Sequence, residues 1–171
     1  NTLYVGLIAV SLALVLATAL AFHYNGSKSR FRELLQLVIF LPFLMPPIIT
    51  GLSLLIFFRE VNIPRSLATV IIGHTVFVLA VVYRIVLARL QTLKASLVEA
   101  SLDLGASRWQ TFRYVLMPML MPAIGSAGIL AFALSFDETL ITLLVTGTDS
   151  TLPMRLWEMM RMGFTPDINA L

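Results

Sequence analysis

Cysteine is absent from the 171-residue sequence, and charged residues make up only 12% of it. Without cysteine the chain has no disulfide, no thiolate zinc site and no iron–sulfur cluster. Soluble domains usually contain about 25% charged and about 45–50% apolar residues, whereas 58% of this chain is apolar. The mean hydropathy of +0.92 excludes an ordinary soluble domain. It also excludes a disordered chain, which needs low hydrophobicity and high charge.

The residue patterns of enzymes and metal sites are also missing. The sequence contains no G-x4-G-K-[ST] loop for ATP and no Ser/His/Asp or Cys/His set in a polar context. Its two histidines, His23 and His74, are too few for a histidine metal site. We therefore expect no catalytic residue, no metal ligand and no cofactor held by this chain. Its basic residues lie in two loops beside apolar segments, which favours membrane topology over nucleic-acid binding.

Four stretches contain no Asp, Glu, Lys or Arg: residues 3–22, 34–58, 66–83 and 114–136. Roughly 20 helical residues cross the hydrocarbon core of a bilayer, which is about 30 Å thick. Each of the four stretches is long enough to do so. The sequence therefore predicts an all-α fold, a polytopic bundle of membrane-spanning helices.

The second stretch contains Pro42, Pro46 and Pro47. Proline removes a backbone donor and bends or breaks a helix, and the carbonyls that it frees need partners within the protein or at a wet cavity. We expect this span to line a pathway or to pack among other helices. A tilted, kinked helix with a purely structural role is the alternative.

Two further features inside the spans predict contacts between helices. Ala123, Ala127 and Ala131 follow one another at a spacing of four residues, which lets two helix backbones approach closely. His74 lies in an otherwise apolar span. A hydrogen bond from its buried ring to a neighbouring helix is favoured over a place in a transport pathway.

The basic residues are distributed unequally between the two sides of the predicted bundle. Eight of the twelve lie in the loops at 23–33 and 84–113: Lys28, Arg30, Arg32, Arg84, Arg89, Lys94, Arg108 and Arg113. The positive-inside rule places these two loops in the cytoplasm and Asn1 outside. The first residue is not Met, and the last residues stop where another apolar segment could begin. We therefore expect at least one further span at each end.

The second of these loops carries signals for two short helices. Ser96 and Glu99 have the spacing of a capping box, which predicts a helix from Leu97. Gly105 is expected to end that helix, and a second capping box, Ser107 with Gln110, starts another. Five apolar residues are expected on the membrane-facing side: Leu97, Leu104, Trp109, Phe112 and Leu116. This pattern indicates a helical hairpin that either docks another protein or lies solvated on the membrane surface.

The same loop resembles a known signature. Glu99-Ala100-Ser101, Gly105 and Val115-x-Met117-Pro118 have the spacing of the EAA motif of ABC importer permeases, E-A-A-x3-G-x9-I-x-L-P. Ser101, Val115 and Met117 replace Ala, Ile and Leu. The resemblance implies a binding-protein-dependent type I permease. Residues 1–171 would form its transmembrane domain without the first and last spans, with a hairpin at 95–117 that couples it to an ATPase.

In the resembled family this hairpin seats in a cleft of the cytoplasmic ATPase. Glu99 would pair with a basic or amide group of the partner, and the small Ala100 would let its surface approach closely. Ser101 belongs to the ATPase-coupling residues by its place in the motif. Asp103 adds charge on the face of Glu99, and Gly105 permits a turn with positive φ. A role for Glu99 in capping alone remains open.

The C-terminal part resembles the second permease subunit of spermidine/putrescine importers, in segments 134–138, 145–147, 151–153 and 163–171. This resemblance implies a bacterial inner-membrane subunit that takes up polyamines. Its partners would be a homologous permease, an extracytoplasmic binding protein and a pair of ATPase subunits that bind the ATP. An importer of opines, aminoethylphosphonate or ferric iron is the nearer alternative, and an ion-coupled secondary transporter the more distant one.

Asp137 and Glu138 directly follow an apolar span, and residues 140–146 are apolar again. We expect the two carboxylates near the outer half of the membrane, where acidic residues are costly and often functional. There they would lower the electrostatic barrier to a polycation. A solvated outer loop is one alternative, and a salt bridge to Arg155 or Arg161 is another.

Overall fold

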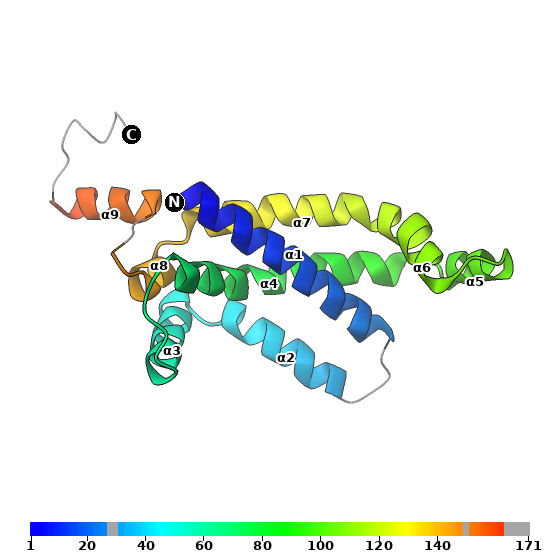
Figure 1. Cartoon of the computed structure of the whole chain (residues 1–171), viewed down its shortest axis with the longest axis horizontal. Helices are drawn as coiled ribbons and strands as arrows, with labels where there is room; N and C mark the ends of the chain where they lie inside the picture. The colour runs from blue at the N-terminus through cyan, green and yellow to red at the C-terminus, as the bar shows by residue number, and fades with distance from the viewer. Residues whose placement is uncertain (27–30, 149–150, 163–171) are drawn as a thin grey trace.

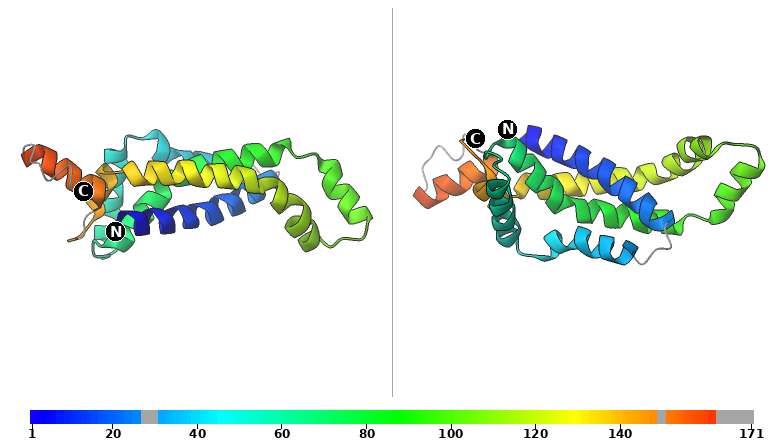
Figure 2. Two further views of the ribbon diagram at one scale, coloured as in Figure 1. Left: turned by 90° about the horizontal axis from the view of Figure 1, so that it is seen from above. Right: turned by 60° about the horizontal axis from the view of Figure 1, so that its bottom comes forward.

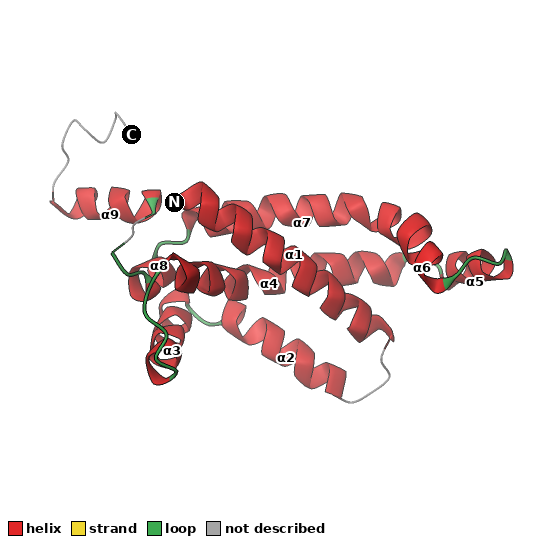
Figure 3. Ribbon diagram, in the orientation of Figure 1, coloured by secondary structure: helices red, strands yellow, loops and turns green. Residues whose placement is uncertain are grey.

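The structure of this chain is a computed structural model that describes residues 1–26, 31–148 and 151–162. Every regular element in these ranges is helical (Figures 1 and 3), which confirms the predicted all-α class. In chain order they are α1 (Thr2–Gly26), α2 (Phe31–Leu44), α3 (Pro47–Glu60), α4 (Leu67–Thr92), α5 (Ala95–Asp103), α6 (Arg108–Thr111), the π-helical segment η1 (Phe112–Leu116), α7 (Met117–Asp137), α8 (Leu140–Val145) and α9 (Leu152–Met162).

Three helices are long and apolar enough to cross a membrane: α1, α4 and the continuous run Arg108–Asp137. They extend together along the long axis of the molecule (Figures 1 and 2). They contain three of the four stretches without charge, so the sequence located these three apolar helices correctly.

The fourth stretch is broken rather than kinked. Helices α2 and α3 meet at 110°, and α3 runs across the long axis of the bundle (Figure 1). The pair counts as a span only if its two bent halves are taken together. The break falls between Leu44 and Pro47, because neither Pro46 nor Pro47 has an N–H group to continue the helix.

The carbonyl freed at this break is paired within the chain. A straight helix would bond the carbonyl of Pro42 to the amide of residue 46, which is a proline. The buried hydroxyl of Thr50 donates to this carbonyl instead, at 2.9 Å. The expectation that a freed carbonyl finds a partner inside the protein is confirmed at this position.

Helix α4 is the centre of the bundle and packs against α1, α2, α3, α7 and α8. Small residues bring its neighbours close. Helix α1 buries a row of alanines at a spacing of four: Ala9, Ala13, Ala17 and Ala21. On α7, Ala127 and Ala131 are fully buried and Ala123 is half-buried. The predicted close packing of α7 is therefore confirmed, and the alanine row of α1 adds a contact that the sequence analysis missed.

The two ends of the bundle differ. At one end, α4 leads into the hairpin of α5 and α6, which projects beyond the other helices, while α3, α8 and α9 lie at the opposite end (Figures 1 and 2). We call the hairpin side the basic end, because Arg84, Arg89, Lys94, Arg108 and Arg113 lie in the segment that forms it. Lys28 and Arg30 lie outside the described residues.

Helix α8 packs so closely on α3 that Gly51 has no room for a side chain. A Cβ atom at this position would lie 2.9 Å from Leu144 Cδ1 and 3.2 Å from Ile141 Cα. Since one of these atoms belongs to the backbone, the two helices would have to move apart. We predict that Gly51→Ala destabilises the detergent-solubilised subunit by about 1–3 kcal/mol, measured by thermal unfolding.

Gly125 of α7 is the matched control, because no atom lies within 4 Å of a Cβ built there. Alanine is favoured over glycine inside a helix by about 1 kcal/mol. Gly125→Ala should therefore leave the melting temperature unchanged or raise it. Equal losses in the two variants would contradict the close contact of α3 and α8.

Candidate functional site

The first arm of the hairpin ends as the sequence predicts. Helix α5 stops at Asp103, and Gly105 adopts φ +85°. The Gly105 amide donates to the carbonyl of Leu102 at 2.9 Å, and the Ala106 amide donates to that of Ser101 at 3.1 Å. These two bonds form a Schellman motif, which satisfies the last carbonyls of the helix and turns the chain back.

The start of the hairpin differs from the expectation. Helix α5 begins at Ala95 after an extended Lys94, with no side-chain cap. Ser96 therefore lies inside the first turn, and the predicted capping box of Ser96 and Glu99 is wrong. Glu99 does not cap α5, and its side chain is exposed in the middle of the helix.

The second capping box is confirmed. The Ser107 hydroxyl accepts from the Gln110 amide at 3.3 Å, and Gln110 Oε1 accepts from the Ser107 amide at 2.7 Å. From here the chain stays helical through η1 into α7, and Pro118 lies in the first turn of α7. Proline denies a partner to the carbonyl four residues before it. Met117 bonds back five residues, to Phe112, so the widened turn of η1 comes directly before Pro118.

Side chains join the two arms of the hairpin to each other and to the bundle. Ser101 of α5 lies 2.9 Å from the buried hydroxyl of Thr111 in α6. Phe112 stacks on Trp109 and meets Phe22 of α1 edge-on, with centroid distances of 5.4 and 5.3 Å. The sequence analysis treated Ser101 only as a departure from alanine and missed this contact. A hydroxyl in an alanine position was the signal that could have revealed it.

The outer surface of the hairpin is both acidic and apolar. Glu99, Ala100 and Asp103 are exposed, and so are Leu104 at 89% and Trp109 at 68%. The hairpin projects past the end of the bundle (Figure 2), and the membrane-facing side expected for Leu104 and Trp109 stays a prediction. An exposed surface of this kind suits a protein partner.

A cavity of about 360 Å³ lies between the hairpin and the bundle. Its walls come from the end of α1, the end of α4 and the start of α5, and Glu99 is one of its lining residues. Glu99 thus lies at the junction of three helices, where a contact with a partner would act on all of them.

At the opposite end the structure separates the two carboxylates. Asp137 is the last residue of α7 and is exposed. Glu138 is only 9% exposed, and its Oε1 accepts from the Ile141 amide at 3.0 Å at the start of α8. Burial raises the pKa of Glu138, against the opposing effect of hydrogen bonds from the Ile141 and Leu140 amides. The alternative of a solvated outer loop is therefore wrong for Glu138. Arg161, one expected salt-bridge partner, lies 4.6 Å from the centroid of the Trp157 ring.

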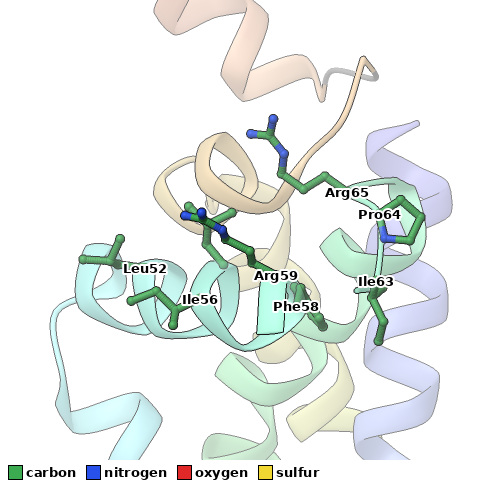
Figure 4. Close-up of a pocket in the computed structure, with 8 residues that line it drawn as sticks. Leu52, Ile56, Phe58, Arg59, Ile63, Pro64 and Arg65 are labelled. Carbon is green, nitrogen blue, oxygen red and sulfur yellow. The ribbon is translucent and has the colours of Figure 1, made fainter. Parts of the chain in front are cut away.

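The same end contains a cavity of about 490 Å³ beside α3 (Figure 4). Apolar side chains of α3 and of the following loop form most of its wall, together with Arg59 and Arg65. Its lining residues include no carboxylate. This cavity therefore does not suit a cation, and Asp137 lies outside it.

His74 is buried at 2% exposure. Its ring nitrogens lie 2.8 Å from Ser135 Oγ of α7 and 2.8 Å from Thr142 Oγ1 of α8. The predicted hydrogen bond to a neighbouring helix is confirmed, and it joins two helices rather than one.

These features define a multi-pass helical membrane protein with an exposed hairpin at its basic end. The chain belongs to the family described as "Binding-protein-dependent transport system inner membrane component", which matches residues 9–166. The family that the EAA spacing indicated is thereby confirmed.

Curated relatives are transport permeases. The chain is 42% identical over 137 residues to the putrescine transport system permease protein PotI of Escherichia coli (strain K12), covering 76% of this chain and 49% of that protein. It is 27% identical over 172 residues to the spermidine/putrescine transport system permease protein PotC of the same strain, covering 100% and 65%. A PotC homolog of Mycoplasma genitalium is 30% identical over 161 residues, covering 92% and 57%. The chain thus spans about half to two thirds of the length of these relatives.

The turn at Gly105 yields a prediction about the hairpin. No atom lies within 4 Å of a Cβ built on Gly105, so alanine there would meet only the backbone strain of positive φ, about 1 kcal/mol. We predict that Gly105→Ala speeds hydrogen exchange in segment 99–110 by about fivefold, measured by mass spectrometry. Gly105→Asn should have a smaller effect, because asparagine tolerates this conformation better. Equal exchange in all three proteins would contradict the assigned turn.

The raised pKa of Glu138 gives a stability that depends on pH. Since the folded protein favours the protonated carboxyl, this stabilisation is present below the ordinary pKa of 4.5 and is lost as the pH rises through the folded value. Glu138→Gln cannot ionise and keeps an oxygen for the Ile141 amide. We predict that the melting temperature of this variant exceeds that of the wild type by more at pH 8 than at pH 4.5. The same difference at both pH values would contradict the burial of Glu138.

Proposed function

We propose that this chain is the transmembrane subunit of an ATP-binding-cassette importer for polyamines, and that it forms half of the translocation pathway. The observation that carries the proposal is the exposed hairpin with EAA spacing at the basic end of a permease-family chain. The names of its relatives support the solute class, because two of them are described as putrescine and spermidine/putrescine permeases.

In this proposal the hairpin at 95–117 docks on a cytoplasmic ATPase pair. Glu99 and Asp103 supply charge for basic or amide groups of the ATPase, and Ala100 and the exposed Leu104 supply a close apolar contact. Ser101 holds the second arm through Thr111, and Gly105 makes the turn. The ATPase subunits bind ATP, so this chain needs no cofactor of its own.

The topology follows from the distribution of charge. The basic end faces the cytoplasm of a bacterial inner membrane, and the opposite end, with α3, α8 and α9, faces the extracytoplasmic binding protein. A homologous permease completes the pathway. The hairpin contacts the ATPase differently in its two states, and this difference drives alternating access.

Of the two carboxylates proposed for the pathway, Asp137 is the one whose side chain a solute can reach. It is exposed at the outer end of α7, whereas Glu138 is buried and holds the start of α8. An exposed carboxylate can contact a polycation directly, although the surrounding water weakens their attraction. Glu138 therefore contributes by placing Asp137 and α8, and its charge is less accessible to the solute.

Reconstitution tests the proposal. The full-length subunit would be placed in proteoliposomes with its permease, ATPase and binding-protein partners, and ATP-driven uptake of labelled spermidine would be measured. We expect saturable uptake that putrescine inhibits and that an opine and aminoethylphosphonate do not. Uptake of another solute in place of spermidine would contradict the polyamine assignment. Uptake driven by an ion gradient without ATP would contradict the importer.

The same assay tests Asp137. An exposed charge pair contributes up to about 1 kcal/mol, so Asp137→Asn should raise the KM for spermidine by up to about fivefold with little change in maximal rate. Glu60→Gln is the matched control, because Glu60 is also an exposed acid that ends a helix at the same end of the molecule. A KM that rises equally in both variants would show that Asp137 acts only through overall charge.

A further inference from the structure

The hydrogen bonds around His74 fit a neutral ring that carries its proton on Nε2. The Thr142 hydroxyl donates to the carbonyl of Glu138 at 3.0 Å, so its oxygen is left to accept from His74 Nε2, 2.8 Å away. Nδ1 of the neutral ring then accepts from the Ser135 hydroxyl at 2.8 Å. The imidazole thereby joins α4 to α8 on one side and to α7 on the other, with each of its nitrogens paired.

Helix α8 depends on such contacts because it is too short to be stable alone. It has six residues, whereas isolated helices shorter than about 12–15 residues are marginal in water. Two polar contacts join it to α4, in addition to the packing of Ile141 and Val145 at Gly73. His74 meets Thr142, and the Thr69 hydroxyl lies 2.7 Å from the carbonyl oxygen of Val145. Since residues 69 and 74 are roughly 7.5 Å apart along α4, both ends of α8 are attached to the same helix.

The other end of α4 leads to the hairpin. Helix α4 has 26 residues and ends at Thr92, and α5 begins at Ala95. At about 1.5 Å per residue, α4 is a rod of roughly 39 Å. One uninterrupted helix therefore carries the hairpin at the basic end and holds α8, next to Asp137, at the opposite end.

We propose that His74 is a positioning residue that fixes α8 to α4 and α7, so that α8 moves with α4 when the hairpin is displaced. This inference rests on the proposed function and deepens it. The physical route is continuous, from the hairpin through α4 to the imidazole, to Thr142 and to α8. Without the imidazole link, only the contact of Thr69 and the packing of Ile141 and Val145 at Gly73 hold α8 to α4, so α8 follows α4 less closely.

Two substitutions at the same position separate the two links. The amide group of glutamine reaches the place of Nε2, so His74→Gln keeps a donor for Thr142. The shorter asparagine reaches only the place of Nδ1. His74→Asn therefore keeps an acceptor for Ser135 and loses the hydrogen bond to Thr142 of α8. Thr142→Val removes the link to α8 from the other side and serves as a second variant should His74→Asn fail to fold.

The readout is the number of ATP molecules hydrolysed per solute molecule taken up, measured in the reconstituted importer with the solute that the wild type transports. We expect this ratio to rise by about threefold in His74→Asn and in Thr142→Val, the factor for one lost hydrogen bond within a membrane. His74→Gln should stay near the wild-type ratio. A merely structural role would lower the amount of folded protein and leave the ratio unchanged, which would overturn the inference.

A second readout follows α8 directly. Residues 1–171 contain no cysteine. In an importer whose other cysteines have been replaced, Leu140→Cys therefore places a single thiol at the first residue of α8. We expect its rate of modification to change between the nucleotide-free and the ATP-trapped complex, and to lose this dependence when His74→Asn is added. An unchanged dependence would overturn the inference even where uptake is normal. Absence of ATP-driven uptake in the wild type would instead overturn the proposed function.

Discussion

Pairing of backbone polar groups away from water is the constraint on which the rest of this structure depends. Each unpaired N–H or C=O in an apolar environment costs several kcal/mol, so the chain breaks only where a partner is available. Pro46 and Pro47 break the helix between α2 and α3, and the Thr50 hydroxyl pairs the Pro42 carbonyl that the break frees. At the end of α5, the amides of Gly105 and Ala106 likewise pair with carbonyls of the last turn. Through these pairings a chain with few charges acquires a bent outer segment at one end and a turned hairpin at the other.

Short polar side chains then connect the helices in a bundle whose packing surfaces are otherwise apolar. The hydroxyls of Thr69, Ser101 and Ser135 and the imidazole of His74 each join elements that are separate along the chain. Such bonds are individually modest, on the order of 0.6 kcal/mol in a membrane. Their main effect is on geometry. Two helices that meet through alanines can slide along each other, whereas a directed hydrogen bond fixes their register.

Much of the fold was predictable because it depends on composition and local chemistry. The lack of charge located α1, α4 and α7, and a glycine and a capping box located the turn between α5 and α6. The predictions that were wrong or incomplete concern positions where local signals compete or where distant residues meet. Ser96 and Glu99 have capping spacing, but the extended Lys94 starts the helix earlier. Three prolines predict a bend, but the angle of 110° and the bond from Thr50 to the Pro42 carbonyl depend on packing that the local sequence does not show. The two partners of His74 lie 61 and 68 residues away in sequence, so no local pattern could name them.

The two candidate sites therefore differ in how they arise. The hairpin is local, since its caps and turn are encoded within about fifteen residues, and it projects from the bundle where a partner can reach it. The outer carboxylates are not local. Glu138 is buried beside α8, which packs against α3 and α4, whereas Asp137 is the last residue of α7 and is exposed. A displacement of the hairpin can reach this end along two helices, through α4 from its first arm and through the run Arg108–Asp137 from its second arm. The contacts at His74 and Thr69 join α8 to α4 at that end, so they set how α8 is placed relative to both helices.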